Sequence, residues 1–429
     1  MRVIAKARTD VGKRRQANQD AFLVDEAMGL YVVCDGMGGH AAGEEASQVG
    51  VETIQSRVRE RLPSMKGVEP ERRAAALTEI LKDAVERANV KVHAIGLDAP
   101  EKRGAGTTCT ALLIQGGLAA LGHVGDTRLY LFRNSEVHQI SNDHTFLAEA
   151  MRRGVSRDEA LKHIPTNMLS RAVGPHPHVD VDTLSFDILP GDKLMLCTDG
   201  LHGYFVESPE LVPYMSDVAR APDLLVDAAN EQGGEDNISV IALEVSPEAP
   251  AAAEDTARLS KVTEALHALS GIELLRELSY SELLEVAGVL RSEEVPSGKV
   301  VLREGETSAA VYIVAHGRVS VERGGKRLAA LTSGSHFGEM ALLTNRPRSA
   351  TVVTLEPTRL LVLTREALYP LFQQNPVLAV KFLWNLGVRQ SLRLDETTEW
   401  LSTGRDNAPD TLVERWGEEM VVSPFSRRV

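Results

Sequence analysis

Four aspartates stand at the ends of apolar, strand-like runs in the first half of the chain. Asp35 follows LYVVC, Asp126 follows LAALGHVG, Asp199 follows KLMLCT, and Asp236 comes just before NISVIALEV. A fifth, Asp20, ends an Arg-x-x-Asn-x-Asp pattern that begins at Arg15. An aspartate that closes a buried strand is costly to desolvate unless a cation receives it, and several such ends at one sheet edge gather like charges.

A hard divalent cation would relieve this repulsion. Carboxylate oxygens without soft ligands select Mg²⁺ or Mn²⁺ over zinc or copper. The glycine that follows Asp35, Gly36, would let a backbone carbonyl approach the ion. The alternative is that these are ordinary turn aspartates, which a single Asp-Gly pair would suggest. The whole ordered set favours a metal centre.

These aspartates belong to a first segment that mixes strands and helices. The β-type runs are GLYVVCD, GTTCTALLI, LAALGHVGD, RLYLFR, DKLMLCTD and NISVIALEV, and two long helical patterns cover Gly43 to Leu62 and Glu71 to Ile95. Because strands and helices do not alternate regularly, the pattern predicts an α+β layered domain. It ends where SPEAPAAAEDTA, residues 246 to 257, has the composition of an exposed linker. We therefore expect a domain at 1–246 and a linker at 247–257.

The remaining sequence predicts a second, smaller domain at 258–395. Helical turns from Leu259 to Leu290 precede short strands punctuated by glycine, and Gly324-Gly325 has the composition of a two-residue hairpin turn. This pattern predicts a small β-barrel or jelly roll followed by helices, the longest at Val377 to Leu394. The tail at 396–429 loses periodicity, although its tryptophans, Trp400 and Trp416, suggest that it docks.

Composition excludes several classes of protein. The chain carries 47 Lys and Arg against 60 Asp and Glu, a net charge of −13, which disfavours a nonspecific grip on nucleic acid or on an anionic membrane. The N-terminus lacks the apolar core of a signal peptide, and no window approaches the roughly 18 apolar residues of a spanning helix. Its 3 cysteines all lie in apolar runs, so we expect buried, reduced thiols and a cytoplasmic protein.

The order of the aspartate motifs resembles the metal-dependent serine/threonine protein phosphatases (PPM family, type 2C), in particular their compact bacterial members. The resemblance runs from about Thr9 to Val245 and includes VVCDGMGGH, GHVGDTRLY, LCTDGL and GGEDNISVI. It implies an α-β-β-α sandwich, two β-sheets flanked by helices, with the metal centre at one edge.

The resemblance also assigns roles to residues of this chain. Asp35 would bridge two Mn²⁺ or Mg²⁺ ions, with the Gly36 carbonyl on one ion and Asp199 and Asp236 on the other. Asp126, aided by Asp199, would hold a third, weaker ion. Arg15 matches the phosphate-binding arginine, and Asp20 matches a further acidic residue beside the metal water. Two close divalent ions would lower the pKa of a shared water and polarise the phosphoryl group for in-line attack.

One position departs from the family. Eukaryotic members place a histidine two residues after the metal aspartate as a proposed general acid, and here that residue is Met37. The leaving serine would then take its proton from a water held by the metal or, as the alternative, from His40. The segment Asn142 to Pro165 resembles the variable flap beside the site, whose basic residues could meet an acidic substrate or could be simple solvated charge.

The second half resembles cyclic-nucleotide-binding domains from about Leu274 to Arg393. The run FGEMALLTNRPRSATV, which begins at Phe337, is similar to their phosphate-binding cassette. The resemblance implies that Arg348 pairs with the cyclic phosphate, that Glu339 accepts the ribose 2′-hydroxyl, and that a short helical turn points backbone amides at the phosphate. The remaining contact residues would be Gly338, Met340, Ala341 and Ser349, and Ser349 does not decide between cAMP and cGMP.

A helix follows the cassette, and in this family such a helix moves over the bound ligand. The sequence places Leu378, Phe382, Leu383, Leu386 and Val388 near one face of it. Trp384 could cap the base, but core packing is the more common role of a tryptophan at helical spacing.

The sequence as a whole predicts a metal-dependent phosphatase that acts on phosphoserine and phosphothreonine in proteins and is regulated by cAMP or cGMP. Its partners would be phosphorylated proteins, such as a serine/threonine kinase or the targets of one, and neither nucleic acid nor a membrane. The alternatives are a catalytically weak, nucleotide-responsive scaffold and a phosphatase whose second domain is only a docking module. The physiological substrate, the sign of regulation and the oligomeric state stay open.

Overall fold

The computed structural model describes residues 1–205, 208–247, 262–266 and 268–403. The chain divides into two compact units, Met1–Ala252 and Ala253–Val429. The predicted linker falls almost entirely within 248–261, outside the described residues. So does most of the predicted tail, including Trp416, and the side chain of Trp400.

The first unit contains two antiparallel sheets. One has the strand order β1-β11-β10-β7-β8, and the other has the order β2-β3-β5-β6-β9, with β4 paired to β3. The strands are β1 (Arg2–Asp10), β2 (Asp20–Asp25), β3 (Leu30–Met37), β4 (Gly106–Thr107), β5 (Cys109–Gln115), β6 (Leu118–Val124), β7 (Arg128–Arg133), β8 (Glu136–Gln139), β9 (Asp182–Asp187), β10 (Lys193–Cys197) and β11 (Ile238–Ser246).

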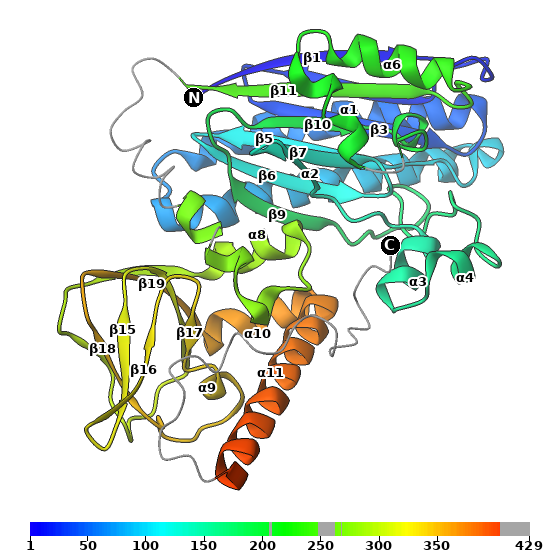
Figure 1. The fold of residues 1–429 in the computed structure, drawn as a ribbon. Helices are drawn as coiled ribbons and strands as arrows, with labels where there is room; N and C mark the ends of the chain where they lie inside the picture. Colours follow the sequence, from blue (N-terminus) through cyan, green and yellow to red (C-terminus); the bar gives the residue numbers. More distant parts are fainter. Residues whose placement is uncertain (206–207, 248–261, 267, 404–429) are drawn as a thin grey trace. The chain divides into compact units, whose positions relative to one another are not determined.

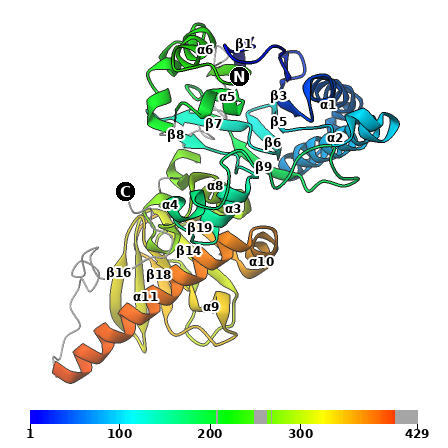
Figure 2. The same cartoon turned by 90° about the vertical axis from the view of Figure 1, so that its right-hand side faces the viewer.

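Helices cover the outer face of each sheet (Figures 1 and 2). The long helices α1 (His40–Arg61) and α2 (Pro70–Asp98) pack on the sheet that contains β3 and β6, whereas α5 (Asp199–His202) and α6 (Ala221–Glu231) pack on β11. Between β8 and β9 the chain forms α3 (Phe146–Arg152) and α4 (Arg157–Leu161). The predicted α-β-β-α sandwich is confirmed.

Strand β3 shows why the central strands have continuous apolar sequences. Leu30, Val32 and Cys34 belong to the core under α1 and α2. The alternate residues, Tyr31 and Val33, are also buried and face the other sheet, because successive side chains of a strand point to opposite faces. A strand that is buried on both faces has no polar side, so its sequence does not alternate.

The second unit also has two antiparallel sheets, ordered β12-β19-β14-β17 and β13-β18-β15-β16. Apolar side chains from both sheets form one core, and helices pack on β14 and β19 in another. The elements are β12 (Arg291–Val295), β13 (Val300–Leu302), β14 (Ala310–His316), β15 (Val319–Arg323), β16 (Lys326–Leu331), β17 (His336–Phe337), β18 (Thr351–Thr354), β19 (Thr358–Thr364), α8 (Tyr280–Val289), α9 (Met340–Leu343), α10 (Arg365–Gln374) and α11 (Pro376–Thr403).

Local predictions in this unit are mostly confirmed. Gly324 and Gly325 join β15 to β16 with φ angles of 55° and 77°, and a two-residue hairpin of this type requires positive φ at both positions. Leu378, Phe382 and Leu386 are buried on one face of α11, but Leu383 is 43% exposed, so its assignment to that face is wrong. The helix also continues past Asp395, the predicted domain end, to Thr403.

Candidate active site

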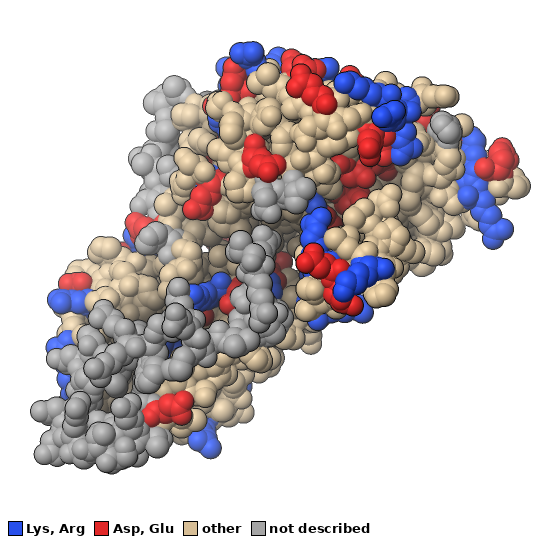
Figure 3. Space-filling model, turned by 45° about the vertical axis from the view of Figure 1, so that its right-hand side comes forward, with Lys and Arg blue, Asp and Glu red and all other residues tan. Residues whose placement is uncertain are grey.

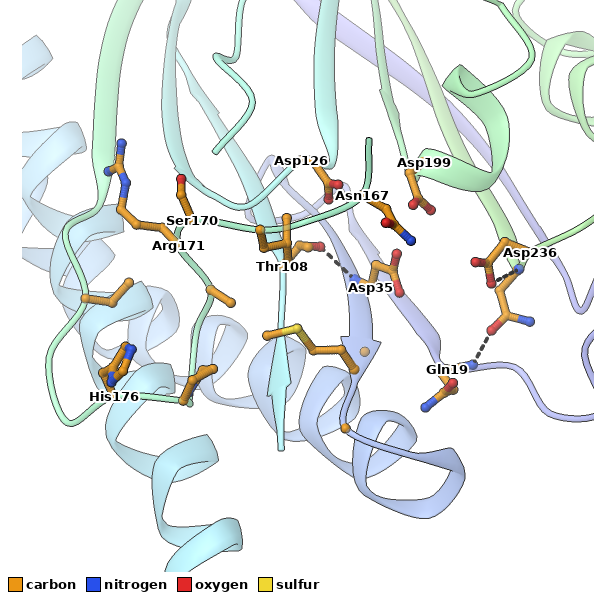
Figure 4. A pocket seen from close by; sticks show the side chains of 18 of the residues that line it. Gln19, Asp35, Thr108, Asp126, Asn167, Ser170, Arg171, His176, Asp199 and Asp236 are labelled. Atoms are coloured by element: carbon orange, nitrogen blue, oxygen red, sulfur yellow. Dashed lines mark hydrogen bonds between the residues drawn. The ribbon is translucent and has the colours of Figure 1, made fainter. Parts of the chain in front are cut away.

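The strand-end aspartates gather around one cavity of the first unit. The cavity has a volume of about 590 Å³, and its lining includes Arg15, Asp35, Asp126, Asp199 and Asp236. Figure 4 shows the four carboxylates directed toward a common space, with Arg171 and His176 on its other side. Figure 3 shows acidic side chains recessed in a hollow of the surface.

Antiparallel strand pairing brings these distant residues together. Asp20, which begins β2, lies directly opposite Asp35 near the end of β3. Strands β10 and β11 are also antiparallel neighbours, so the end of β10 that leads to Asp199 lies beside the start of β11, which follows Asp236. The turn after β6 carries Asp126 to the same edge. One edge of the sandwich thus collects all five carboxylates.

The backbone around Asp35 is tightly fixed. The Asp35 N–H donates to Thr108 Oγ1 at 2.9 Å, and the Asp35 carbonyl accepts from the Thr108 N–H at 2.8 Å. Gly36 lies against α1 so closely that a Cβ there would stand 2.0 Å from the carbonyl oxygen of Gly43. Glycine is therefore required at this position for packing, in addition to the approach to an ion that the sequence predicted.

Asp20 supports the site from behind the cavity wall. It is not among the lining residues, and its Oδ2 accepts hydrogen bonds from Thr198 Oγ1 at 2.9 Å and Ser239 Oγ at 2.7 Å. Thr198 directly precedes Asp199, and Ser239 lies in β11. Asp20 therefore ties the ends of β10 and β11 to the start of β2.

If all of these carboxylates were ionised, they would carry more negative charge than the described residues neutralise. Burial raises the pKa of Asp20 to about 7 and that of Asp126 to about 8, and it raises the pKa of Asp35 well above its ordinary value. Neighbouring aspartates increase each of these pKa values further. Burial also raises the pKa of Asp199. In the part of the chain that the structure describes, no donor reaches the buried Oδ1 atoms of Asp20 and Asp199.

This donor set fits a hard divalent cation, which would favour the ionised carboxylates and occupy their unpaired oxygens. Among the described residues, no three carboxylate, imidazole or thiol groups converge on a single ion position. Backbone carbonyl and water ligands would have to complete the coordination, and Mg²⁺ in proteins usually keeps several waters.

One arginine of the cavity already pairs with a strand-end aspartate. Arg15 Nη2 donates to Asp236 Oδ2 at 2.6 Å, and the two side chains are 46% and 34% exposed. An exposed guanidinium at the rim of an acidic cavity is free to turn toward an incoming anion.

One supporting residue that was not predicted from the sequence is Asn237. Asn237 accepts from the Gln19 N–H at 2.8 Å through Oδ1 and donates through Nδ2 to the carbonyls of Val11 and Ala17, both at 3.0 Å. It therefore fixes the loop that carries Arg15. Its place in the run NISVIALEV, directly after Asp236, was the available signal. Met37 lines the cavity as predicted for its position, and the side chain of His40 lies outside the described residues.

The predicted nucleotide cassette is built around a buried arginine, unlike the cavity with its exposed Arg15. Arg348 is 7% exposed, and its guanidinium donates to Ser308 Oγ at 2.8 Å, to the Gly338 carbonyl at 2.9 Å and to the Ala310 carbonyl at 2.7 Å. A Cβ on Gly338 would stand 2.5 Å from Arg348 Nη1, so only glycine permits this contact. No carboxylate forms an ion pair with Arg348 among the described residues.

The other cassette residues surround this arginine to different degrees. Glu339 is 3% exposed and accepts from Gln390 Nε2 of α11 at 3.4 Å. Ala341 is buried, whereas Met340 and Ser349 are exposed. Trp384 is 40% exposed, so it is not packed into the core of the second unit.

Comparisons with known proteins agree with both halves of the chain. The protein phosphatase 2C family model matches residues 11–225, and the cyclic nucleotide-binding domain model matches residues 292–375. The serine/threonine phosphatase Stp of Listeria innocua is 31% identical over 246 residues, which cover 56% of this chain and 95% of Stp. The chain belongs to the protein phosphatase 2C family.

Solved structures support this membership. The serine/threonine phosphatase PstP of Mycobacterium tuberculosis superposes with a TM-score of 0.50 at 31% identity, covering 57% of this chain and all of that one. The Streptococcus agalactiae serine/threonine phosphatase gives a TM-score of 0.50 at 27% identity over 57% of this chain. This chain is accordingly a metal-dependent serine/threonine phosphatase with a cyclic nucleotide-binding domain. No helix among its described residues has the length and apolar character needed to cross a bilayer.

Proposed function

We propose that this phosphatase dephosphorylates phosphoserine and phosphothreonine in protein substrates at the aspartate-lined cavity, and that a cyclic nucleotide bound to the second unit changes its rate. The observation that carries the catalytic part is the set of buried, mutually repelling carboxylates at the edge of the sandwich, two of which have an oxygen that receives no hydrogen bond from the described residues. A site of this kind is costly to keep unless a cation occupies it.

The metal ligands would be Asp35, the Gly36 carbonyl, Asp199 and Asp236 for a pair of Mn²⁺ or Mg²⁺ ions, and Asp126 with Asp199 for a third. When bound, the ions would activate water as a nucleophile and stabilise charge on the phosphoryl oxygens. The rigid backbone around Asp35 and the ties that Asp20 makes to Thr198 and Ser239 hold the ligand-bearing strands in place.

Arg15 would bind the phosphate of the substrate. Its guanidinium stands at the cavity beside Asp236 and can make two parallel hydrogen bonds to phosphate oxygens. Met37 carries no transferable proton, so the proton for the leaving serine or threonine oxygen has to come from another group. The exposed position of Arg15 lets a phosphorylated side chain of a protein reach it.

The regulatory part rests on the second unit. Its cassette presents a buried guanidinium whose hydrogen bonds within the described residues go to three neutral oxygens, so the positive charge remains available to an anionic group such as a cyclic phosphate. Glu339, also buried, would accept the ribose 2′-hydroxyl.

A docking module is the second candidate for this unit, and one observation favours it. The three acceptors of Arg348 lie within the protein, so the arginine also has a purely structural use as a bridge between Ser308, Gly338 and Ala310. In that case neither cAMP nor cGMP would bind.

The experiment is hydrolysis of a phosphothreonine peptide by the full chain in Mn²⁺, with and without cAMP or cGMP. A change in turnover with one nucleotide, in either direction, supports regulation. Turnover that neither nucleotide alters, together with no heat of binding in calorimetry on the same protein, would leave the docking module as the function of the second unit.

A further inference from the structure

Two histidines that the proposed mechanism does not use hold the turn that carries Asp126. This turn joins β6 to β7 and begins at Gly125. His144 lies between β8 and α3, and His202 is the last residue of α5, the short helix that Asp199 begins. Two separate segments of the chain therefore meet at one dipeptide.

His144 binds both polar groups of the Gly125 backbone. The backbone N–H of His144 donates to the Gly125 carbonyl at 2.7 Å, and the Gly125 N–H donates to the ring atom His144 Nδ1 at 3.1 Å. Because Nδ1 accepts, the ring proton resides on Nε2, which donates to Asp182 Oδ2 at 3.0 Å. The ring of His144 is completely buried, so this neutral tautomer and its orientation are fixed from both sides.

His202 binds the next residue of the turn. Its Nε2 lies 2.9 Å from the backbone carbonyl oxygen of Asp126, and because a carbonyl only accepts, Nε2 carries the proton. The backbone of the Gly125–Asp126 dipeptide is therefore held on one side by His144 and on the other by His202.

The turn needs this restraint. Gly125 has a φ of 107°, and a Cβ there would stand 2.6 Å from Thr108 Cβ, so the position accepts only the residue with the greatest conformational freedom. The carboxylate of Asp126 is repelled by Asp199 and in turn raises the pKa of Asp35. A free turn would relieve the repulsion by rotating Asp126 out of the cavity.

We propose that His144 and His202 are positioning residues: their ring hydrogen bonds fix the Gly125–Asp126 turn, keep the Asp126 carboxylate directed into the cavity, and so set the affinity of the ion that Asp126 holds. This inference rests on the proposed function, which assigns a divalent ion to Asp126. Hydrogen bonds that orient metal ligands typically change metal affinity by about 10-fold to 100-fold.

Amide side chains distinguish positioning from general packing. The amide of asparagine reaches the place of a histidine Nδ1, and the longer glutamine reaches the place of Nε2. His144→Asn therefore keeps an acceptor for the Gly125 N–H, while His144→Gln loses it. The pattern reverses at the other residue, where His202→Gln keeps a donor for the Asp126 carbonyl and His202→Asn loses it.

The experiment is a Mn²⁺ titration of the full chain without substrate, with free Mn²⁺ followed by electron paramagnetic resonance. Asp126→Asn is expected to remove the weakest class of bound ion. His144→Gln and His202→Asn should weaken that class about 10-fold to 100-fold, and His144→Asn and His202→Gln should bind within a few-fold of wild type.

The control is Asp192→Asn. It breaks the buried ion pair between Asp192 and Arg133, whose side chains are 2% and 6% exposed, and so destabilises the same unit without touching the turn. It should bind Mn²⁺ as wild type does. Circular dichroism spectra identify any variant that fails to fold, and the two amide-retaining variants still test the proposal in that event, since weak binding by either one contradicts it.

Two further results would overturn the inference, and they differ in whether the assignment of an ion to Asp126 also fails. If Asp126→Asn leaves every class of Mn²⁺ unchanged, the assignment of an ion to Asp126 fails together with the positioning role. If Asp126→Asn removes an ion but the two amides at each histidine behave alike, the ion assignment stands and the positioning role fails.

Discussion

The two sites of this chain present opposite electrostatic conditions. At the catalytic cavity carboxylates outnumber the nearby cations: among the described residues no donor reaches the buried Oδ1 atoms of Asp20 and Asp199, and Arg15 is 46% exposed with one carboxylate partner. In the nucleotide cassette the buried cation is Arg348, which is 7% exposed and already donates to three oxygens of the protein, and the buried carboxylate of Glu339 attracts it.

This difference has consequences for binding. A divalent cation can enter the catalytic cavity without displacing the hydrogen bonds that fix Asp35 or Asp20, and it removes a repulsion that the fold otherwise retains. A cyclic phosphate can reach Arg348 only by sharing or displacing the hydrogen bonds to Ser308, Gly338 or Ala310. We therefore expect metal binding to stabilise the first unit directly and nucleotide binding to require rearrangement of the cassette.

The largest expected effect comes from removing one carboxylate of the cavity. Asp35→Asn should lower kcat/KM for a phosphothreonine peptide by about 1,000-fold or more, because metal ions supply several kcal/mol of transition-state stabilisation. The matched control is Asp98→Asn at the exposed end of α2, which should behave as wild type. Activity of Asp35→Asn within tenfold of wild type would remove Asp35 from the metal site.

An intermediate effect is expected at the cassette. Arg348→Lys keeps the charge but not the planar fork, so affinity for the cyclic nucleotide that binds should fall about 10-fold to 100-fold. The second unit should also lose about 1–3 kcal/mol of stability, because buried carbonyls lose their donor. Calorimetry and thermal unfolding of the full chain measure the two effects.

Arg346→Lys is the control for this substitution, because Arg346 is exposed in the same loop. It should change neither nucleotide affinity nor stability. If Arg348→Lys binds nucleotide as tightly as wild type, the cyclic phosphate does not contact Arg348. Nucleotide binding then does not require the hydrogen bonds of Arg348 to rearrange.

A further effect concerns stability rather than turnover or binding: the metal-free protein should show a pH-dependent stability. The pKa of Asp20 is raised to about 7 and that of Asp126 to about 8, from an ordinary value of 3.8 in both cases. Between the unfolded and folded pKa values of these aspartates, the folded chain binds more protons than the unfolded chain. The free energy of unfolding therefore falls as the pH rises from about 4 to about 8.

Mn²⁺ should cancel this dependence by favouring the ionised carboxylates. Chemical denaturation at several pH values, with chelator or with excess Mn²⁺, measures the difference between the two curves. Curves that stay parallel across this pH range would mean that the aspartates do not interact with the ion.

The sequence was most informative where strands are buried on both faces. The runs that the sequence identified in the first unit, among them LYVVC and NISVIALEV, form inner strands of the two sheets. The strands that it missed in this unit, β1, β2, β8 and β9, are the edge strands of the two sheets. Edge strands such as RVIAKARTD carry charged residues at alternate positions, so the apolar signal is diluted and resembles that of a loop.

The same reasoning explains which site residues could be predicted. Aspartates at strand ends are visible in a sequence, because a charge next to an apolar run is unusual. The residues that hold them, Thr108, His144 and His202, act through hydrogen bonds to partners far away in the chain, such as Thr108 to Asp35 across 73 positions. Likewise, Ser308 and Ala310 come within hydrogen-bond distance of Arg348 only in the folded barrel, so the local sequence does not predict these acceptors.

We propose that the aspartate-lined cavity is a divalent metal site at which phosphorylated proteins are hydrolysed. Its most direct test is turnover of a phosphothreonine peptide by the full chain in excess chelator, followed by addition of Mn²⁺ or Mg²⁺. We predict that chelation abolishes hydrolysis and that either ion restores it, whereas hydrolysis that continues in excess chelator would show that the cavity acts without a divalent ion.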